Sequence, residues 1–409
     1  MKKIVILGAG VTGLSLGQML KDKAEVLILE RHNHIGGIAA TRKKEGGTYH
    51  TVGGHCFNSK YPEVMKFVFS ILQENQWHKT QRLSRINFGE YEVDYPVEFS
   101  IKQIFEKDPD FAFKATVDFM SSAEKGSYSN LADWFAGKFG EELCNRYFLP
   151  YNTKIWGKNP TEMDYKWVQD KLPIPDKRAF FNALMQPTTD SMPHSSFYYP
   201  NTNDQATLIE SLAKGIDIRV STPVQSIRKS GDQWVINDTI TADIVVSTIP
   251  LNELPALVES VPDEILYQAS LLKYNKVSNV FWESKLTPKT WTYQPGKDTI
   301  FHRYIHIGSF FKPAKGFTIT ECVGEHSYEE MVEYGKRDPF LIKPLDYNIS
   351  DHAYVVFDEN RAKAVEEISS WLSEIGLRSI GRFGRWEYYN MDICMLDSMH
   401  TANEINKQL

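Results

Sequence analysis

The chain has 409 residues, of which 42% are hydrophobic and 24% charged, a composition typical of a globular protein with a large core. The formal net charge is −6, and lysine and arginine are scattered, so the sequence shows no surface typical of nucleic-acid or anionic-membrane binding. No stretch approaches the roughly 18 consecutive apolar residues of a membrane span. We therefore expect a cytoplasmic monomer or homodimer, with neither nucleic acid nor membrane as a partner.

The four cysteines give no metal or disulfide pattern. Cys56, Cys144, Cys322 and Cys394 are widely separated, with no CxxC pair and no histidine at ligand spacing. A disulfide framework and a structural zinc site are therefore not expected.

Alternating predicted elements begin at the amino terminus. "KKIVIL" predicts a strand, "VTGLSLGQMLKD" a helix and "AEVLILE" a second buried strand, which together make a βαβ unit. Residues 61–195 are mainly helical in pattern and rich in tryptophan and tyrosine, whereas residues 216–250 return to short strands with turn signals. Residues 265–350 predict a mixed sheet, and an amphipathic helix (359–376) precedes a final helix.

This order predicts an α/β protein with a discontinuous Rossmann-like nucleotide-binding domain, a helical insertion domain and a mixed β-sheet substrate domain. The expected boundaries are 1–90, 196–264 and 356–409 for the three parts of the nucleotide-binding domain, 91–195 for the helical domain and 265–355 for the mixed-sheet domain.

A dinucleotide motif follows the first predicted strand. Residues 8–13, "GAGVTG", place Gly8, Gly10 and Gly13 in GxGxxG spacing at the start of a helix. Gly8 permits a tight turn, Gly10 lets the backbone approach a pyrophosphate, and Gly13 allows close packing of helix on strand. Glu30 ends the next strand, where an acidic residue can accept hydrogen bonds from ribose hydroxyls.

The residues after Glu30 indicate that the Rossmann-like domain is an FAD-binding domain rather than an NAD-binding one. Gly36 and Gly37 directly follow the second strand, and "VVSTIP" (245–250) resembles the strand that closes FAD-binding domains. A plain NAD-binding domain normally continues into another helix at this point.

Five segments, in order along nearly the whole chain, resemble the UDP-galactopyranose mutase family. "GGHCFNSKYPEVMKFV" is similar to its Gly-x-His-x-Phe loop, and "VDYPVEFSI" to its Pro-x-Pro segment with one proline kept. "YNTKIWGKNPTEM" is similar to its Lys-x-Trp-Gly signature. "YVVFDENRAKAV" and "GRFGRWEYYNMD" resemble its last two segments.

The resemblance implies a flavin-dependent mutase that interconverts UDP-galactopyranose and UDP-galactofuranose, or a related nucleotide sugar, for surface polysaccharide synthesis. The family works only with reduced FAD and through a covalent reduced-flavin–sugar intermediate, so no side-chain nucleophile is expected. The protein binds the nucleotide, stabilises its developing charge and holds the sugar against the flavin.

The expected cofactor contacts combine the glycine motif with the family match. His55 is expected to donate a hydrogen bond near the reactive flavin nitrogen, and Asp392 to lie at a helix N-terminus that faces the flavin. The full set for FAD is Gly8, Gly10, Thr12, Gly13, Glu30, Arg31, Gly36, Gly37, Gly53, Gly54, His55, Val224, Gly384, Met391 and Asp392.

The expected substrate contacts suit a pyrophosphate and a planar base. Arg303 stands where the family has a phosphate-binding arginine, and Tyr354, Tyr388 and Tyr389 match positions that give hydroxyls to the same phosphates. Tyr151, Asn152 and Trp156 are candidates for the uracil pocket. His55, Arg303 and Lys171 form the expected catalytic set. Any single aromatic residue here can instead belong to the core.

Several positions depart from the family pattern. In "KLPIPDKR", Lys171 replaces the first of two family arginines and Pro175 the second, so Lys177 or Arg178 are left as possible substitutes. Lysine lacks the bidentate fork of arginine. His306-Ile307-Gly308 and Asn203-Asp204 also differ from the family.

Two alternatives stay open. An FAD-dependent oxidoreductase of the amine oxidase and protoporphyrinogen oxidase class shares the same FAD domain, but predicts an apolar or amine-accepting pocket without a phosphate clamp. A flavin-binding protein that has lost catalysis is the other, against which the retention of His55, Arg303 and the tyrosines argues.

Overall fold

A parallel βαβ unit opens the chain in the computed structural model, which describes residues 1–122, 126–169, 172, 174–185 and 196–409. Strands β1 (Lys3–Leu7) and β2 (Glu25–Leu29) pair in parallel, and helix α1 (Val11–Leu20) connects them. Four of the five residues in each strand are buried, as expected for a parallel sheet that is covered on both faces. The βαβ prediction is confirmed.

Later segments complete this sheet in the order β19-β13-β1-β2-β9, with all neighbours parallel. The added strands are β9 (Asp217–Arg219), β13 (Ile244–Ser247) and β19 (Arg378–Ser379). Segments that are far apart in the chain therefore meet in one sheet, and the prediction of an α/β fold is confirmed.

The two faces of the parallel sheet carry separate cores, because side chains alternate along each strand. Ile4 and Ile6 pack toward one face with α1 and three other helices, whereas Val5 and Leu7 pack toward the opposite face. The first face is covered by α2 (Pro62–Ile71), α9 (Ala206–Ala213) and α14 (Met391–Asn406). The second is covered by α10 (Asp263–Leu271), α12 (Arg361–Ile375) and a small sheet of β10 (Ile227–Ser230), β11 (Gln233–Ile236) and β12 (Ile240–Ala242).

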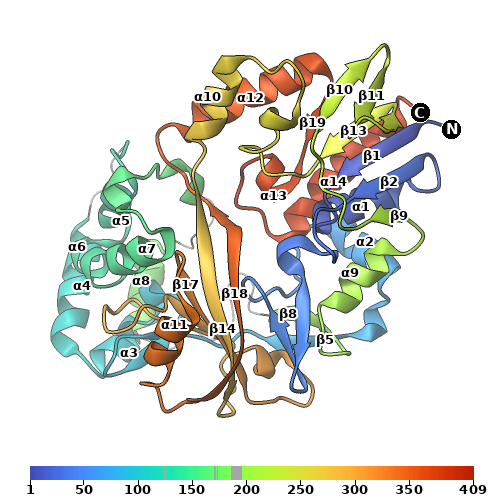
Figure 1. Ribbon diagram of the computed structural model, residues 1–409. Helices are drawn as coiled ribbons and strands as arrows, with labels where there is room; N and C mark the ends of the chain where they lie inside the picture. Colours follow the sequence, from blue (N-terminus) through green and yellow to red (C-terminus); the bar gives the residue numbers. More distant parts are fainter. Residues whose placement is uncertain (123–125, 170–171, 173, 186–195) are drawn as a thin grey trace.

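A seven-stranded mixed sheet stands beside the parallel sheet (Figure 1). Its order is β18-β14-β17-β16-β15-β6-β7, and only the β15–β6 pair is parallel. The strands are β6 (Ser84–Asn87), β7 (Glu92–Asp94), β14 (Tyr274–Ser284), β15 (Trp291–Tyr293), β16 (Arg303–Ile305), β17 (Phe317–Val323) and β18 (Leu341–Val355).

Strands β6 and β7 lie in a stretch that the sequence pattern treats as mainly helical. The proposed domain boundary at residue 90 falls between these two paired strands. Two ribbons also lie nearby: β3 (Thr41–Lys44) with β4 (Gly47–His50), and β5 (Trp77–Gln81) with β8 (Ser196–Pro200).

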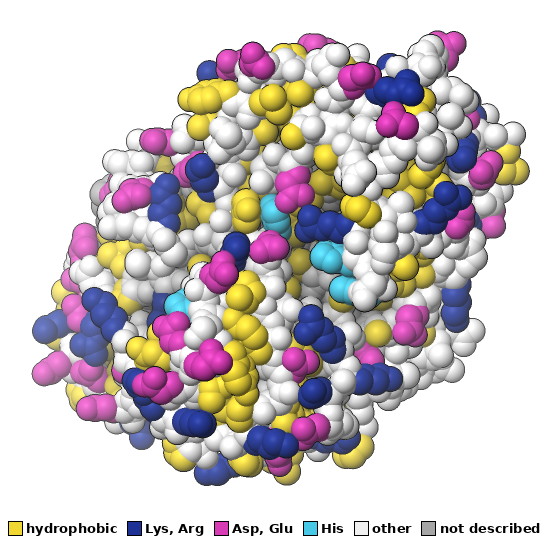
Figure 2. Space-filling view, viewed as in Figure 1, with side chains coloured by type: hydrophobic (Ala, Val, Ile, Leu, Met, Phe, Trp, Pro, Cys, Tyr) yellow, Lys and Arg dark blue, Asp and Glu magenta, His cyan; other side chains and the backbone are white. Residues whose placement is uncertain are grey.

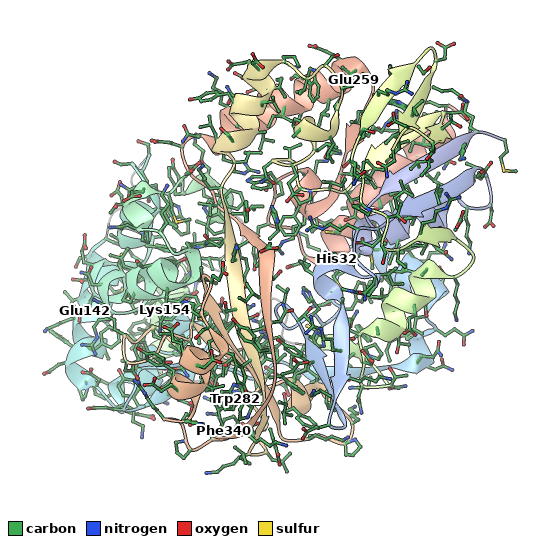
Figure 3. The ribbon with its side chains drawn as sticks, in the orientation of Figure 1. His32, Glu142, Lys154, Glu259, Trp282 and Phe340 are labelled. Atoms are coloured by element: carbon green, nitrogen blue, oxygen red, sulfur yellow. The ribbon has the colours of Figure 1, made fainter. Side chains whose placement is uncertain are left out.

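Short helices pack against the other side of the mixed sheet and share its core. They are α3 (Ile101–Phe105), α4 (Pro109–Ser121), α5 (Leu131–Phe139), α6 (Glu141–Leu143), α7 (Leu149–Trp156) and α8 (Lys177–Met185). Lys154 of α7 donates hydrogen bonds to the carbonyl groups of Gln294 and Gly296 and so ties this region to the chain after β15 (Figure 3).

Two further short helices complete the description: α11 (Tyr328–Gly335) and α13 (Gly381–Gly384). The two chain termini lie close together at the edge of the parallel sheet (Figure 1). Within the described part of the chain, no helix is both long and apolar enough to cross a membrane.

Candidate active site

A cavity of about 840 Å³ is lined by residues from both the parallel sheet and the mixed sheet. It runs from the glycine turn after β1, past the 53–56 loop, to side chains of β15, β16 and β18. Figure 2 shows histidine side chains near lysine and arginine around a hollow in the middle of the visible face. The lining therefore joins a glycine turn at one end to basic and aromatic side chains at the other.

The glycine turn forms one end of the cavity. Gly8 has a φ of +103°, and a Cβ on Gly13 would lie 2.0 Å from the Gly8 carbonyl oxygen, so both positions require glycine. Glu30 holds the turn in place, because its carboxylate accepts hydrogen bonds from the backbone N–H groups of Ala9 (2.8 Å) and His32 (2.9 Å). These contacts present the N-terminus of α1 to the cavity.

His55 lies in the middle of the cavity, on the loop after β4. Its Nε2 is buried and has no hydrogen-bond partner among the described residues. Burial, with smaller effects from His50, Arg382 and Arg303, lowers the pKa of His55 to about 3. The imidazole is therefore neutral at physiological pH, and its free ring nitrogen is available to a ligand.

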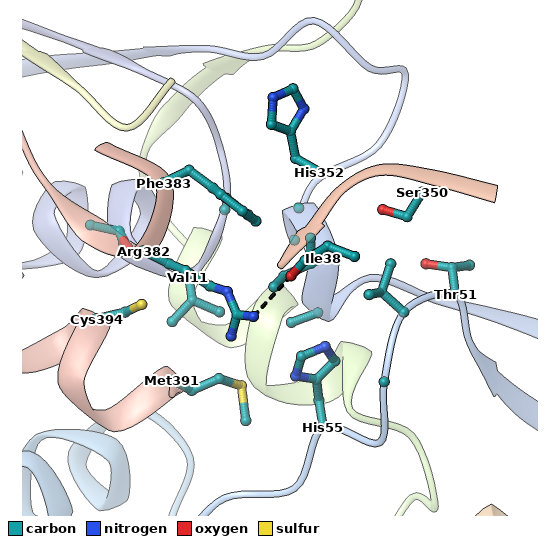
Figure 4. Close-up of a pocket in the computed structure, with 18 of the residues that line it drawn as sticks. Val11, Ile38, Thr51, His55, Ser350, His352, Arg382, Phe383, Met391 and Cys394 are labelled. Carbon is teal, nitrogen blue, oxygen red and sulfur yellow. Dashed lines mark hydrogen bonds between the residues drawn. The ribbon is translucent and has the colours of Figure 1, made fainter. Parts of the chain in front are cut away.

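The N-terminus of α14 faces the same space. Met391 and Asp392 line the cavity at the first turn of this helix, and Figure 4 shows the side chains of Met391, His55 and Arg382 around a common space. Arg382 donates to the carbonyl oxygens of Tyr389 (3.0 Å) and Ala353 (2.8 Å), which fixes its guanidinium against the cavity wall.

Arg303 is held by a buried carboxylate. Its Nε donates to Glu321, which has no exposed surface, and its Nη2 donates to the Tyr354 hydroxyl at 2.7 Å. Burial alone disfavours a charged arginine, but the Glu321 carboxylate outweighs it, and the pKa of Arg303 is raised well above its usual value. Glu321 also accepts a hydrogen bond from the Gly53 N–H at 2.6 Å, so it joins Arg303 to the His55 loop.

Further aromatic and basic side chains lie beside Arg303 and Tyr354. The Tyr354 and Tyr388 rings stack with centroids 5.9 Å apart, and the Arg382 guanidinium lies 4.5 Å from the Tyr388 centroid. Tyr389 also lines the cavity. The site therefore offers two guanidinium groups and several tyrosines in one wall, which suits an anionic ligand.

The family model for flavin-containing amine oxidoreductases matches residues 11–300 of the chain. The chain belongs to this family. It is an FAD-dependent flavoprotein.

Two proteins of known activity are similar to parts of this flavoprotein. It is 27% identical over 262 residues to the lysine-specific histone demethylase 1B of Mus musculus, covering 61% of this chain and 30% of the demethylase. It is 29% identical over 183 residues to the dTDP-fucopyranose mutase of Escherichia coli, covering 42% of this chain and 46% of the mutase. The chain thus spans less than half the length of each of these relatives.

A reduced UDP-galactopyranose mutase has a similar solved structure, with a TM-score of 0.86, 19% identity and coverage of 100% of this chain and 96% of that one. At this identity the match shows the fold. Together with the curated mutase, it confirms the resemblance to the mutases that the five sequence segments indicate.

The cavity of the flavoprotein fits FAD. A Cβ on Gly10 would meet only the Gly37 Cα, at 4.0 Å, so the two glycines leave room for a pyrophosphate between turn and helix. The unpartnered Nε2 of His55 gives a polar contact farther along the cavity. Of the residues expected to contact FAD, those that line the cavity are Gly8, Gly10, Thr12, Glu30, Arg31, Gly36, Gly37, Gly53, Gly54, His55, Val224, Met391 and Asp392.

Gly13 and Gly384 do not line the cavity of the flavoprotein. Gly13 packs α1 against the turn, and a Cβ on Gly384 would lie 2.9 Å from the Ser379 hydroxyl. Both glycines allow the elements around the cavity to pack closely on one another.

Three expected base-binding residues do not reach the cavity either. The Trp156 indole donates to the Asn152 side chain at 3.1 Å, and Asn152 donates to the Phe148 carbonyl at 2.8 Å, so these groups satisfy each other within the helical region. Tyr151 stacks on Tyr147 with centroids 5.6 Å apart. Lys171 lies outside the described residues.

Sequence reasoning missed Glu321, Arg382 and Arg82 in this flavoprotein. The sequence does mark Glu321, because it is an acidic residue within the mainly uncharged run "FTITECV", and the structure buries it completely. Arg382 lies inside the matched "GRF" segment but was not singled out. Arg82 is enclosed by aromatic residues that only the fold brings together.

Proposed function

We propose that this flavoprotein is a mutase that interconverts the pyranose and furanose forms of UDP-galactose, or of a closely related nucleotide sugar. The arrangement of Arg303, Glu321 and Tyr354 beside the His55 loop carries the proposal. A charged guanidinium and tyrosine hydroxyls next to the proposed flavin position suit a nucleotide diphosphate whose sugar reaches the flavin.

Arg303 and the tyrosines would hold the pyrophosphate and stabilise the charge that develops when the nucleotide leaves the anomeric carbon. Glu321 orients Arg303 through its Nε, so the Nη groups of the guanidinium can donate to Tyr354 and to the ligand. Tyr388, stacked on Tyr354, is placed to add a hydroxyl. Preorganised charge of this kind is worth far more in an enclosed site than in water.

His55 would bind the cofactor rather than transfer a proton, because its depressed pKa keeps the imidazole neutral. Its free Nε2 would contact the flavin. When bound and reduced, FAD supplies the nucleophile for the anomeric carbon. The protein's own residues therefore need only bind, orient and exclude water.

Oxidation of a substrate by FAD is the second candidate function. The family match over residues 11–300 and the similarity to a histone demethylase favour it. The two candidates differ in the chemistry they need from the cavity, since a nucleotide sugar needs cationic groups for its pyrophosphate, whereas an amine substrate without an acidic group does not.

Turnover by the dithionite-reduced holoprotein tests the proposal. With UDP-galactofuranose, we expect UDP-galactopyranose to form with reduced protein and not with oxidised protein. Arg303→Ala should keep FAD but lose nearly all turnover and much UDP affinity, because the clamp loses its charge. Arg337→Ala is the matched control, since Arg337 is 56% exposed and pairs with Glu333 on α11.

The outcomes separate the candidates. UDP binding without conversion would point to another nucleotide sugar, for which dTDP-fucose is the next substrate to try. Absence of UDP binding, with a normal flavin spectrum, would reject the mutase and favour the oxidoreductase. Parental turnover by Arg303→Ala would show that the clamp is wrongly assigned.

A further inference from the structure

A further arginine, Arg82, lines the cavity beside the β15–β16 pair that carries Arg303. Arg82 lies between β5 and β6, with its guanidinium 4.7 Å from the Trp291 ring centroid and 5.8 Å from that of Tyr95. Its Nη2 donates to the Tyr293 hydroxyl at 2.8 Å and its Nε to the Ser84 hydroxyl at 3.0 Å. These contacts fix the plane of the guanidinium within an aromatic wall.

Arg82 differs from Arg303 in having no acidic partner among the described residues. The Arg82 guanidinium donates to the hydroxyls of Tyr293 and Ser84 and packs against the rings of Trp291 and Tyr95, whereas Arg303 has the carboxylate of Glu321. Removal of a charge from water is costly unless an opposite charge compensates it. A cation enclosed at a ligand cavity without such a partner points to an anionic ligand group.

The position of Arg82 puts it next to the proposed phosphate clamp. Tyr293 and Arg303 are paired across β15 and β16, and Arg82 contacts Tyr293 from the β6 side. Burial raises the pKa of the Cys56 thiol to about 12, and Arg82 lies near enough to this thiol to oppose the rise. Cys56 follows His55 directly, so Arg82 adjoins both the proposed phosphate clamp and the His55 loop, and the sugar of a nucleotide held by the clamp would lie near it.

We propose that Arg82, with the Tyr293 hydroxyl, binds a carboxylate on the sugar of the substrate, so that the preferred nucleotide sugar is a hexuronic acid or a similar acidic sugar and neutral UDP-galactose is a weaker substrate. This inference rests on the proposed mutase function and narrows its substrate class. The planar arginine fork matches a planar carboxylate in two parallel hydrogen bonds. Neutral galactose would leave the Arg82 charge without a partner.

Calorimetric titration of the FAD-loaded protein tests this proposal with three ligands: UDP, UDP-galactose and UDP-galacturonic acid. We expect UDP-galacturonic acid to bind roughly tenfold or more tightly than UDP-galactose, as one charge-assisted hydrogen-bonded pair allows. Arg82→Gln should abolish this preference and leave the affinity for UDP unchanged. Arg82→Lys, which keeps the charge without the fork, should retain part of the preference.

Arg85→Gln is the matched control. Arg85 lies three residues farther along the chain, pairs with Asp94 and does not line the cavity, so this variant should keep the preference. The flavin absorbance and the melting temperature of each variant show whether it is folded.

The possible failures are distinct. If the wild-type protein binds UDP but does not prefer UDP-galacturonic acid over UDP-galactose, the Arg82 proposal is wrong and the mutase proposal stands. If Arg82→Gln lowers the affinity for UDP itself, Arg82 binds a phosphate and the carboxylate assignment is wrong. If UDP does not bind at all, the mutase proposal fails and this inference fails with it.

Discussion

Three buried histidines carry uncharged rings in the folded protein. Burial lowers the pKa of His50, His55 and His306 to about 3. The Nδ1 of His50 accepts a hydrogen bond from the His55 N–H at 3.2 Å, so its Nε2 carries the proton and donates to the Tyr199 hydroxyl at 2.8 Å. This neutral tautomer supports the loop that carries His55.

These histidines make stability depend on pH. Between pH of about 6.5 and 3 the unfolded chain binds protons at these rings, whereas the folded protein does not. The free energy of unfolding therefore falls as the pH is lowered from about 7 toward 4. Urea unfolding of the holoprotein at pH 7, 6 and 5 measures this slope.

His306→Gln separates the histidine contribution from that of the carboxylates. The His306 ring is buried between the hydroxyls of Thr292 (2.9 Å) and Thr318 (3.0 Å), and it does not line the cavity. The variant should show a shallower dependence of unfolding free energy on pH, whatever its stability at pH 7. An identical slope in the two proteins would show that His306 is not neutral when folded.

At the scale of the element, the turn between β1 and α1 contains glycines with two different purposes. A Cβ on Gly13 would clash with the Gly8 backbone at 2.0 Å, whereas a Cβ on Gly10 would find its nearest neighbour at 4.0 Å and point toward the cavity. Gly13 is required by the protein fold and Gly10 by the space left for the ligand.

We therefore expect Gly10→Ala to fold with an unchanged apoprotein melting temperature but to lose at least about tenfold in FAD affinity, since the methyl group occupies the pyrophosphate position. Gly13→Ala should lower the melting temperature of the apoprotein itself. Fluorescence titration with FAD and thermal unfolding of both apoproteins measure these effects. Equal FAD affinity for Gly10→Ala and the wild type would place the pyrophosphate elsewhere.

Local patterns predict some elements and not others. The βαβ unit is predictable because strand, glycine turn and helix follow within 30 residues, each with its own periodicity. Strands β6 and β7 are missed because they are only four and three residues long, and β6 joins the mixed sheet through β15, about 200 residues later. Pairing over such a separation leaves no local signal.

The same reasoning applies to the candidate site. Arg303 and the tyrosines are found through a family match, and the fold brings them together at one wall. The direction of a side chain depends on packing, however, so Asn152 and Trp156 bond to each other instead of facing the cavity. Arg82 lies in the wall through contacts with Trp291 and Tyr293, which no spacing rule connects to it.

At the scale of the whole molecule, the cavity exists only when distant segments are joined. Helix α14 packs on α1 at the other end of the chain, and the Ser398 hydroxyl donates to the Thr12 carbonyl at 3.0 Å. The same helix brings Met391 and Asp392 to the cavity. Helix α14 is therefore part of the core around the first strand, and the cofactor end of the cavity depends on this helix.

Removal of residues 391–409 should prevent stable folding and FAD binding. The deletion exposes the core face of α1 and removes several apolar side chains, among them Met395 and Ile405, neither of which has exposed surface. Each such side chain contributes about 1.5–3 kcal/mol, and a native domain has only about 5–15 kcal/mol in total. Removal of residues 407–409 alone is the control, because all three are exposed and follow the helix. Far-UV circular dichroism and flavin absorbance of the two shortened proteins measure folding and FAD binding. A folded, FAD-containing protein without α14 would show that the parallel sheet and its cofactor end form independently of the carboxyl terminus.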